Sequence, residues 1–154
     1  MLTTSTKLTR PPTVSLCPAA EAYDYEYFHS RLAEPALLAN AVAVRVFRAP
    51  LLAVPIGGPR RGGYMSFDLL TLATAARGLL AGQAGFPDIR IRWSPFRGAC
   101  HTVEWGDPAP EWWENNMGFG RFYGYSEAAI TTFVREHPHF PSPAVSVPCS
   151  PTAP

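Results

Sequence analysis

Three stretches of the chain place apolar residues three or four positions apart, which is the spacing of one helix face. This pattern predicts helices over residues 19–33, 68–81 and 126–136. Pro35 would end the first helix and begin a short one over residues 35–39, because proline is tolerated in a first helical turn. Asp68 and Ser126 precede the later helices and are expected to cap them.

Between these helices the apolar residues alternate with polar ones, as in a strand with one buried face. Residues 42–47 and 51–56 are predicted to form a first hairpin and residues 88–105 a second. In the second hairpin, pairing Trp93 with Ala99 brings the apolar residues of both strands to one side. Arg92 would then face Cys100, Arg90 would face Thr102, and Trp93 and Trp105 would be buried in the core.

The order of elements is helix, hairpin, helix, hairpin, helix. It predicts an α+β fold in which the two hairpins form one four-stranded, mainly antiparallel sheet with helices on one face. The aromatic residues run from Tyr23 to Phe140, so the apolar core is expected between them. We therefore expect a single globular domain over residues 19–140, a disordered arm over residues 1–18 and a disordered proline-rich tail over residues 141–154.

Several functional classes find no support in the sequence. Residues 1–18 contain no apolar run of the kind that a secretory signal has, and no stretch is long enough to span a membrane. A cytoplasmic protein that does not bind membranes is therefore expected. Cys17, Cys100 and Cys149 form neither a disulfide framework nor a zinc motif, so free thiols are expected. His137 and His139 have no third ligand at useful spacing, and neither a metal nor a cofactor is expected.

The charged residues are unevenly distributed. The whole chain carries a net charge of +1, but residues 41–100 hold eight arginines against two aspartates, which gives +6. The remaining residues hold five basic side chains against ten acidic ones, which gives −5. Arginine binds phosphate and carboxylate groups through paired hydrogen bonds. A GC-rich coding sequence would explain the preference for arginine over lysine, but it does not explain the clustering.

A glycine-rich segment, Gly-Gly-Pro-Arg-Arg-Gly-Gly, occupies residues 57–63 and is predicted to be a loop between a strand and a helix. Phosphate-binding loops occupy the same place, but they continue with lysine and a serine or threonine where this chain has Gly63 and Tyr64. A nucleoside triphosphate site is therefore excluded. Arg60 and Arg61 could still hold a smaller anion together with backbone N–H groups. A solvated connection is the more frequent alternative.

Arg45, Arg90 and Arg92 are expected on the same, polar face of the predicted sheet. Such a face would suit nucleic acid or an acidic partner. The alternative is a charged sheet surface that only prevents edge pairing. An isoelectric point of about 7.8 disfavours nucleic acid.

Six aromatic residues crowd residues 112–125, interleaved with glycines. They predict either a lid packed on the core or a binding surface, with Trp112 or Trp113 partly exposed.

Several short motifs together resemble a family of small actinobacterial proteins known only as a domain of unknown function. They are Leu52–Pro55, Gly57–Tyr64, Phe86–Asp88, Ile91–Pro95, Val103–Gly106, Phe122–Ser126 and Ala129–Ile130. The resemblance covers about residues 20–136. It implies a compact domain and transfers no activity or site.

The sequence therefore favours a non-enzymatic binding or regulatory module that presents arginines to an anionic ligand or an acidic protein. The alternative is a small enzyme or ligand-binding protein that acts on an anionic small molecule under the glycine-rich loop. No paired carboxylates, triad or cofactor motif supports a catalytic site, and no catalytic residue is assigned. The candidate binding residues are Arg60, Arg61, Gly62, Gly63, Tyr64, Arg45, Arg90, Arg92, Trp112 and Trp113.

Overall fold

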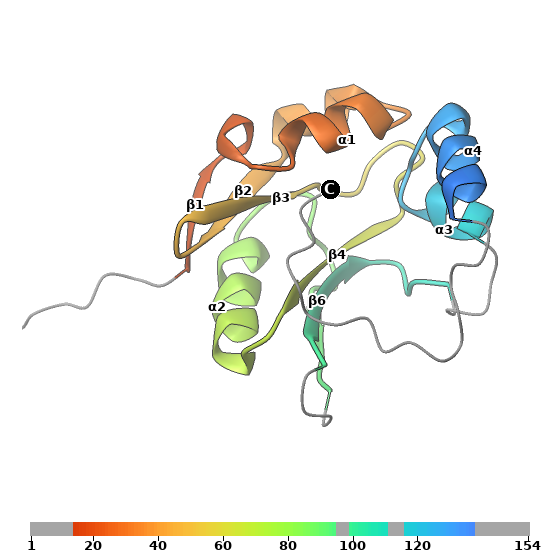
Figure 1. Cartoon of the computed structure of the whole chain (residues 1–154). Helices are drawn as coiled ribbons and strands as arrows, with labels where there is room; N and C mark the ends of the chain where they lie inside the picture. The colour runs from red at the N-terminus through yellow and green to blue at the C-terminus, as the bar shows by residue number, and fades with distance from the viewer. Residues whose placement is uncertain (1–13, 95–98, 111–115, 138–154) are drawn as a thin grey trace, which may run out of the picture.

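The structure is a computed structural model that describes residues 14–94, 99–110 and 116–137, and it is an α+β fold (Figure 1). The strands are β1 (Val14–Pro18), β2 (Val42–Val46), β3 (Ala49–Ala53), β4 (Gly62–Phe67), β5 (Arg90–Arg92) and β6 (His101–Gly106). The α-helices are α1 (Tyr25–Arg31), α2 (Leu70–Ala81), α3 (Asn116–Phe122) and α4 (Glu127–Glu136). Two 3-10 helices, η1 (Ala19–Glu21) and η2 (Pro35–Asn40), flank α1.

The strands form two separate antiparallel sheets, and the predicted single four-stranded sheet is wrong. The first sheet has the order β1-β2-β3 and the second has the order β4-β6-β5. Both predicted hairpins exist within the described residues, but each pairs with a third strand that was not predicted. In the first sheet this is Val14–Pro18, where Val14 pairs with Val46. The disordered arm expected over residues 1–18 is therefore wrong for these five residues.

The third strand of the second sheet comes partly from the glycine-rich segment, since β4 begins at Gly62. A Cβ atom on Gly63 would lie 2.5 Å from the Trp105 ring, and one on Gly62 would lie 2.7 Å from the Phe122 ring. Both distances are too short for a side chain. These two glycines are therefore explained by close packing of aromatic rings against a strand, and the predicted loop is wrong at this end.

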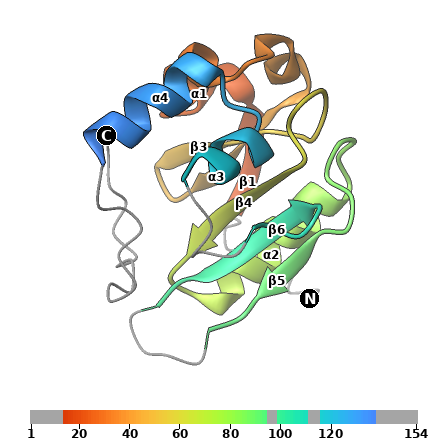
Figure 2. The ribbon, with the colours of Figure 1, turned by 90° about the vertical axis from the view of Figure 1, so that its right-hand side faces the viewer.

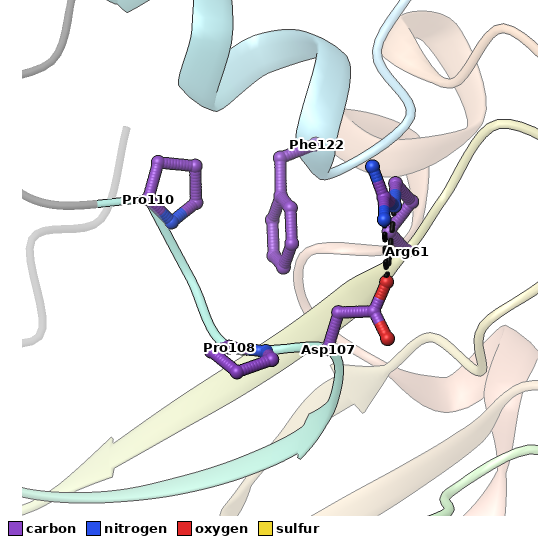
Figure 3. Close-up of a pocket in the computed structure, with 5 residues that line it drawn as sticks. All are labelled: Arg61, Asp107, Pro108, Pro110 and Phe122. Atoms are coloured by element: carbon purple, nitrogen blue, oxygen red, sulfur yellow. Dashed lines mark hydrogen bonds and ion pairs between the residues drawn. The ribbon is translucent and has the colours of Figure 1, made fainter.

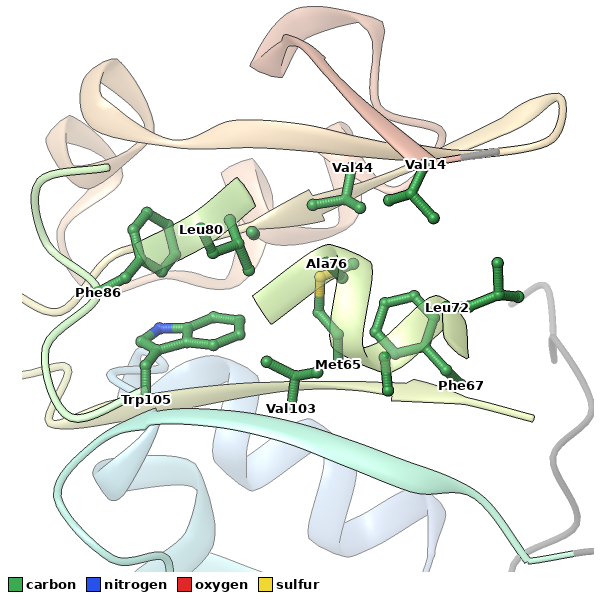
Figure 4. Close-up of a cluster of buried hydrophobic side chains, with 12 residues drawn as sticks. Val14, Val44, Met65, Phe67, Leu72, Ala76, Leu80, Phe86, Val103 and Trp105 are labelled. Atoms are coloured by element: carbon green, nitrogen blue, oxygen red, sulfur yellow. The ribbon is translucent and has the colours of Figure 1, made fainter. Parts of the chain in front are cut away.

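The largest apolar cluster lies between the two sheets and includes one face of α2 (Figure 4). The first sheet contributes Val14, Val44 and Ala53, and the second contributes Met65, Phe67, Val103 and Trp105. Trp105 is 1% exposed, and its indole N–H donates to the Val54 carbonyl at 3.0 Å. This ring is buried with its polar atom paired, as a core tryptophan requires.

A second apolar cluster covers the opposite face of the first sheet. Ala43, Leu52 and Val54 point to this side, where Leu32 and Leu38 pack on them. In Figure 1, α1 lies on one side of the first sheet and α2 on the other. Both faces of the first sheet are therefore covered by protein.

The predicted helix over residues 19–33 is interrupted, because Asp24 turns toward the first sheet. Its carboxylate accepts a hydrogen bond from the Leu52 backbone N–H at 2.7 Å. The short second helix is confirmed as η2. The cap at Ser126 is also confirmed, since its hydroxyl accepts from the Ala129 N–H at 3.1 Å. The cap at Asp68 is wrong, because α2 begins after Leu69 without a side-chain cap.

The predicted register of the second hairpin is wrong by two residues. Arg90 pairs with Glu104 and Arg92 with Thr102, so each side chain keeps its predicted face but has a different neighbour. A slip of two preserves the alternation, and for this reason the pattern alone did not detect it. Trp93 is 59% exposed because β5 ends at Arg92, so its predicted burial is wrong, whereas that of Trp105 is confirmed.

Two further findings concern the cysteines and the membrane. Cys17 is a free thiol, but Cys100 is disulfide-bonded, so the expectation of free thiols is wrong for Cys100. None of the helices in the described part of the chain has the length and apolar character that a membrane crossing requires.

Candidate functional site

The structure separates the arginines that were expected on one face. Arg45 lies on β2 in the first sheet, where its guanidinium is 3.6 Å from the Glu21 carboxylate. Arg90 and Arg92 lie on β5 in the second sheet. The predicted surface of three arginines is therefore wrong, because it required all three to belong to one sheet.

Arg60 is buried, with 5% of its surface exposed. Its guanidinium donates to the carbonyls of Val54 at 3.3 Å and Tyr123 at 2.8 Å. Its central carbon lies 6.0 Å from the Phe28 ring centroid. Arg60 thus joins α1, the β3–β4 connection and the turn between α3 and α4. Its guanidinium is buried among these segments and does not face solvent.

The surroundings of Arg60 perturb its pKa and those of the neighbouring phenols. Burial lowers the pKa of Arg60, although the nearby tyrosines oppose this shift. Burial also raises the pKa values of Tyr123 and Tyr125, so both phenols stay neutral at physiological pH and can donate hydrogen bonds. This cluster stabilises the junction and presents no free charge to solvent.

The surface of the second sheet that faces away from α2 is more open. We call it the outer face, and it consists of Tyr64 and Ser66 from β4, Thr102 and Glu104 from β6, and Arg90 and Arg92 from β5. In Figure 2 the second sheet is seen from this side, with α2 behind it. These residues alternate along each strand with side chains of the core.

Glu104 organises the outer face. It is 7% exposed, and its two oxygens lie 3.4 Å from Nε of Arg90 and 3.1 Å from Nη2 of Arg92. Arg90 also donates to the carbonyls of Asp88 and Gly106, so it is held on several sides. The Arg92 side chain is 68% exposed. Glu104 therefore fixes one end of the Arg92 guanidinium and leaves the rest of that group facing solvent.

Tyr64 lies directly across from Glu104 in the strand register and adds an exposed aromatic ring to the same face. Its ring centroid is 5.4 Å from that of Tyr123. Partial burial of the phenol raises the pKa of Tyr64, while 54% of the residue remains exposed at the surface. An exposed ring and an exposed guanidinium thus flank a buried carboxylate.

A hollow of about 450 Å³ lies where β4 begins and β6 ends, beside the outer face. It is lined by Arg61, Asp107, Pro108, Pro110 and Phe122 (Figure 3). Arg61 donates from Nε and Nη2 to Oδ2 of Asp107, at 3.0 and 2.9 Å. The arginine that the glycine-rich segment offers to solvent is thus already paired with a carboxylate.

The remaining candidates are two glycines of the glycine-rich segment and two tryptophans. Gly62 and Gly63 are buried in β4 and do not form a cradle for an anion. Trp112 and Trp113 lie outside the described residues. Glu104 and Asp107 were not among the candidates, although Glu104 stands between the apolar Val103 and Trp105 in β6, and this could have marked it. Among the residues that the structure describes, no three histidine, cysteine or acidic side chains could together hold a metal ion.

Comparison with known proteins gives a family and no activity. No curated protein and no solved structure matches the chain. The resemblance to a family known only as a domain of unknown function is confirmed at that level. Residues 16–153 match the model of a family of unknown function, DUF6302, and the chain belongs to this family.

Proposed function

We propose that the chain is a non-enzymatic binding module that uses the outer face of the second sheet to bind an acidic segment of a partner protein. The observation that carries this proposal is the arrangement of Arg92, Glu104 and Tyr64. The buried Glu104 orients Arg92 toward solvent, and Tyr64 lies exposed across the strand pair. An oriented guanidinium loses less conformational freedom when it binds a carboxylate.

The residue types and the charge of the outer face also support a protein partner. Tyrosine and arginine supply a large share of the binding energy at protein interfaces. Arg90 and Arg92 carry two positive charges against the single negative charge of Glu104, which leaves one positive charge. This is enough to favour carboxylates. It is small for nucleic acid, which is bound by neutralising several phosphates at once.

The alternative is a small enzyme or ligand-binding protein that acts on an anionic small molecule beside the glycine-rich segment. It has less support, because Arg60 is buried and Arg61 is paired with Asp107. The actinobacterial origin implied by the resemblance and the expected cytoplasmic location stay predictions beside this proposal.

The test measures the anisotropy of a fluorescein-labelled oligoglutamate peptide at low salt with wild type, Arg92→Ala and Arg48→Ala. Arg48 is an exposed residue in the β2–β3 turn, so its variant loses the same charge at a distant place. We expect Arg92→Ala to weaken binding about tenfold and Arg48→Ala to leave it nearly unchanged. Binding should also weaken as salt is added.

Two results would contradict the proposal. Equal weakening by both variants would mean that the peptide responds only to net charge. Tighter binding of a single-stranded oligonucleotide than of the acidic peptide would make nucleic acid the better ligand class.

A further inference from the structure

The hollow beside the outer face carries two opposite charges on one rim, and we propose that it binds a zwitterionic amino acid with an apolar side chain. This inference is independent of the proposed function, since it uses Arg61 and Asp107 instead of Arg92 and Tyr64. The Arg61 and Asp107 side chains are 68% and 54% exposed, so a small molecule can reach both.

The ion pair favours a ligand that also has both charges. A simple anion near Arg61 is repelled by Asp107, and a simple cation near Asp107 is repelled by Arg61. Within the described residues, the ion pair uses Nε and Nη2 of Arg61 and Oδ2 of Asp107. This leaves Nη1 to donate to a ligand carboxylate and Oδ1 to accept from a ligand ammonium. An amino acid carries these two groups on one carbon, so a single small molecule can offer a partner to each side chain of the ion pair.

The backbone holds the ion pair in place before any ligand arrives. The Asp107 N–H donates to the Arg61 carbonyl at 3.0 Å, and the Arg61 N–H donates to the Phe122 carbonyl at 2.9 Å. Gly106 has a φ of +80°, and a Cβ atom there would lie 2.4 Å from the Arg61 carbonyl oxygen. Only glycine fits this turn, and it keeps the two segments close. A site held in this way needs little rearrangement on binding.

The other walls of the hollow are apolar. Figure 3 shows the Phe122 ring between Pro110 and Arg61, with Pro108 and Asp107 on the adjacent segment. The volume of about 450 Å³ falls within the range of about 300–1,000 Å³ that is usual for small-molecule sites. A charged rim above proline and phenylalanine fits a ligand with a charged head and an apolar side chain.

Three matched ligands test the two charges separately. L-phenylalanine has both, N-acetyl-L-phenylalanine lacks the ammonium, and L-phenylalaninamide lacks the carboxylate. We expect wild type to bind L-phenylalanine at least about tenfold more tightly than either derivative, as measured by shifts of the Arg61 and Asp107 amide resonances. Asp107→Asn should reduce the preference over the N-acetyl compound, and Arg61→Gln should reduce the preference over the amide.

Arg92→Ala is the control that separates this site from the outer face. It should leave L-phenylalanine binding unchanged while it weakens the acidic peptide, and a common loss of both would contradict the separation. The inference is overturned if the N-acetyl compound binds as tightly as L-phenylalanine, since the hollow would then be an anion site. It is also overturned if neither L-phenylalanine nor L-leucine gives saturable shifts. Arg61→Gln and Asp107→Asn both change exposed side chains, and the melting temperatures of these two variants verify that they are folded.

Discussion

The two sheets have the same number of strands and the same antiparallel pairing, but they differ in how many faces the protein covers. The first sheet is buried on both sides, with Val44 facing α2 and Ala43 facing the layer formed by α1 and η2. The second sheet buries Val103 and Trp105 on one side and presents Arg92 and Tyr64 on the other. Because both faces of the first sheet are covered, the binding surfaces proposed for this chain lie on and beside the second sheet.

The sequences of the strands account for this difference. β2 reads Val-Ala-Val-Arg-Val, with small and apolar residues on both faces apart from Arg45. β5 reads Arg-Ile-Arg, and β6 places Glu104 between two apolar residues. Burying the outer face of the second sheet would leave the Arg92 charge without water, which is costly unless a partner supplies a carboxylate.

The largest expected effect tests the core that the two sheets share. Trp105→Ala removes a buried ring and its hydrogen bond to Val54, and it should lower the free energy of unfolding by about 3–5 kcal/mol. Trp93→Ala is the matched control and should cost less than about 1 kcal/mol, because this ring is mostly exposed. Urea denaturation of both variants checks this, and similar losses would show that the end of the second sheet is packed differently.

A smaller effect compares one ion pair on each sheet. Glu104→Gln leaves Arg90 and Arg92 without their buried carboxylate and should cost about 1–3 kcal/mol. Glu21→Gln, which removes the exposed partner of Arg45 on the first sheet, should change stability by less than about 0.5 kcal/mol. Equal effects in chemical denaturation would mean that Glu104 is solvated and does not orient Arg92.

The smallest effect concerns Asp24, which joins the covering layer to the first sheet. Burial raises the pKa of this carboxyl, although the hydrogen bond from the Leu52 N–H opposes the shift. The folded protein then binds this proton more tightly than the unfolded chain. The contribution of Asp24 to stability is therefore fully present below its ordinary pKa of 3.8 and is lost as pH rises through the raised value.

Asp24→Asn should remove this pH dependence while it keeps an oxygen that can accept from Leu52. Relative to the variant, wild type should lose less than about 1 kcal/mol of stability as the pH rises from about 4 to about 6. Denaturation midpoints across this range measure the effect, with the exposed Asp68→Asn as the control. A wild type that instead gains stability relative to Asp24→Asn would reverse the sign of the shift.

Local sequence patterns determined the elements whose structure depends on residues close in the chain. Helical spacing predicted α2 and α4, and Ser126 caps α4 because its hydroxyl reaches an N–H three residues away. Alternation of apolar residues placed Val103 and Trp105 inside and Glu104 outside. These properties follow from side-chain direction along one strand or helix, which does not depend on the partner segment.

Only the tertiary structure decided which distant segments meet. Val14–Pro18 and Gly62–Phe67 have weak strand patterns by themselves, and they become strands because β2 and β6 offer open edges for pairing. The environments of the two arginines in the glycine-rich segment also depend on distant segments. Arg60 and Arg61 are neighbours with identical chemistry, yet one is buried among tyrosines and the other pairs with Asp107 at the surface. Contacts between residues 46 or 63 positions apart produce this difference, and no local pattern encodes them.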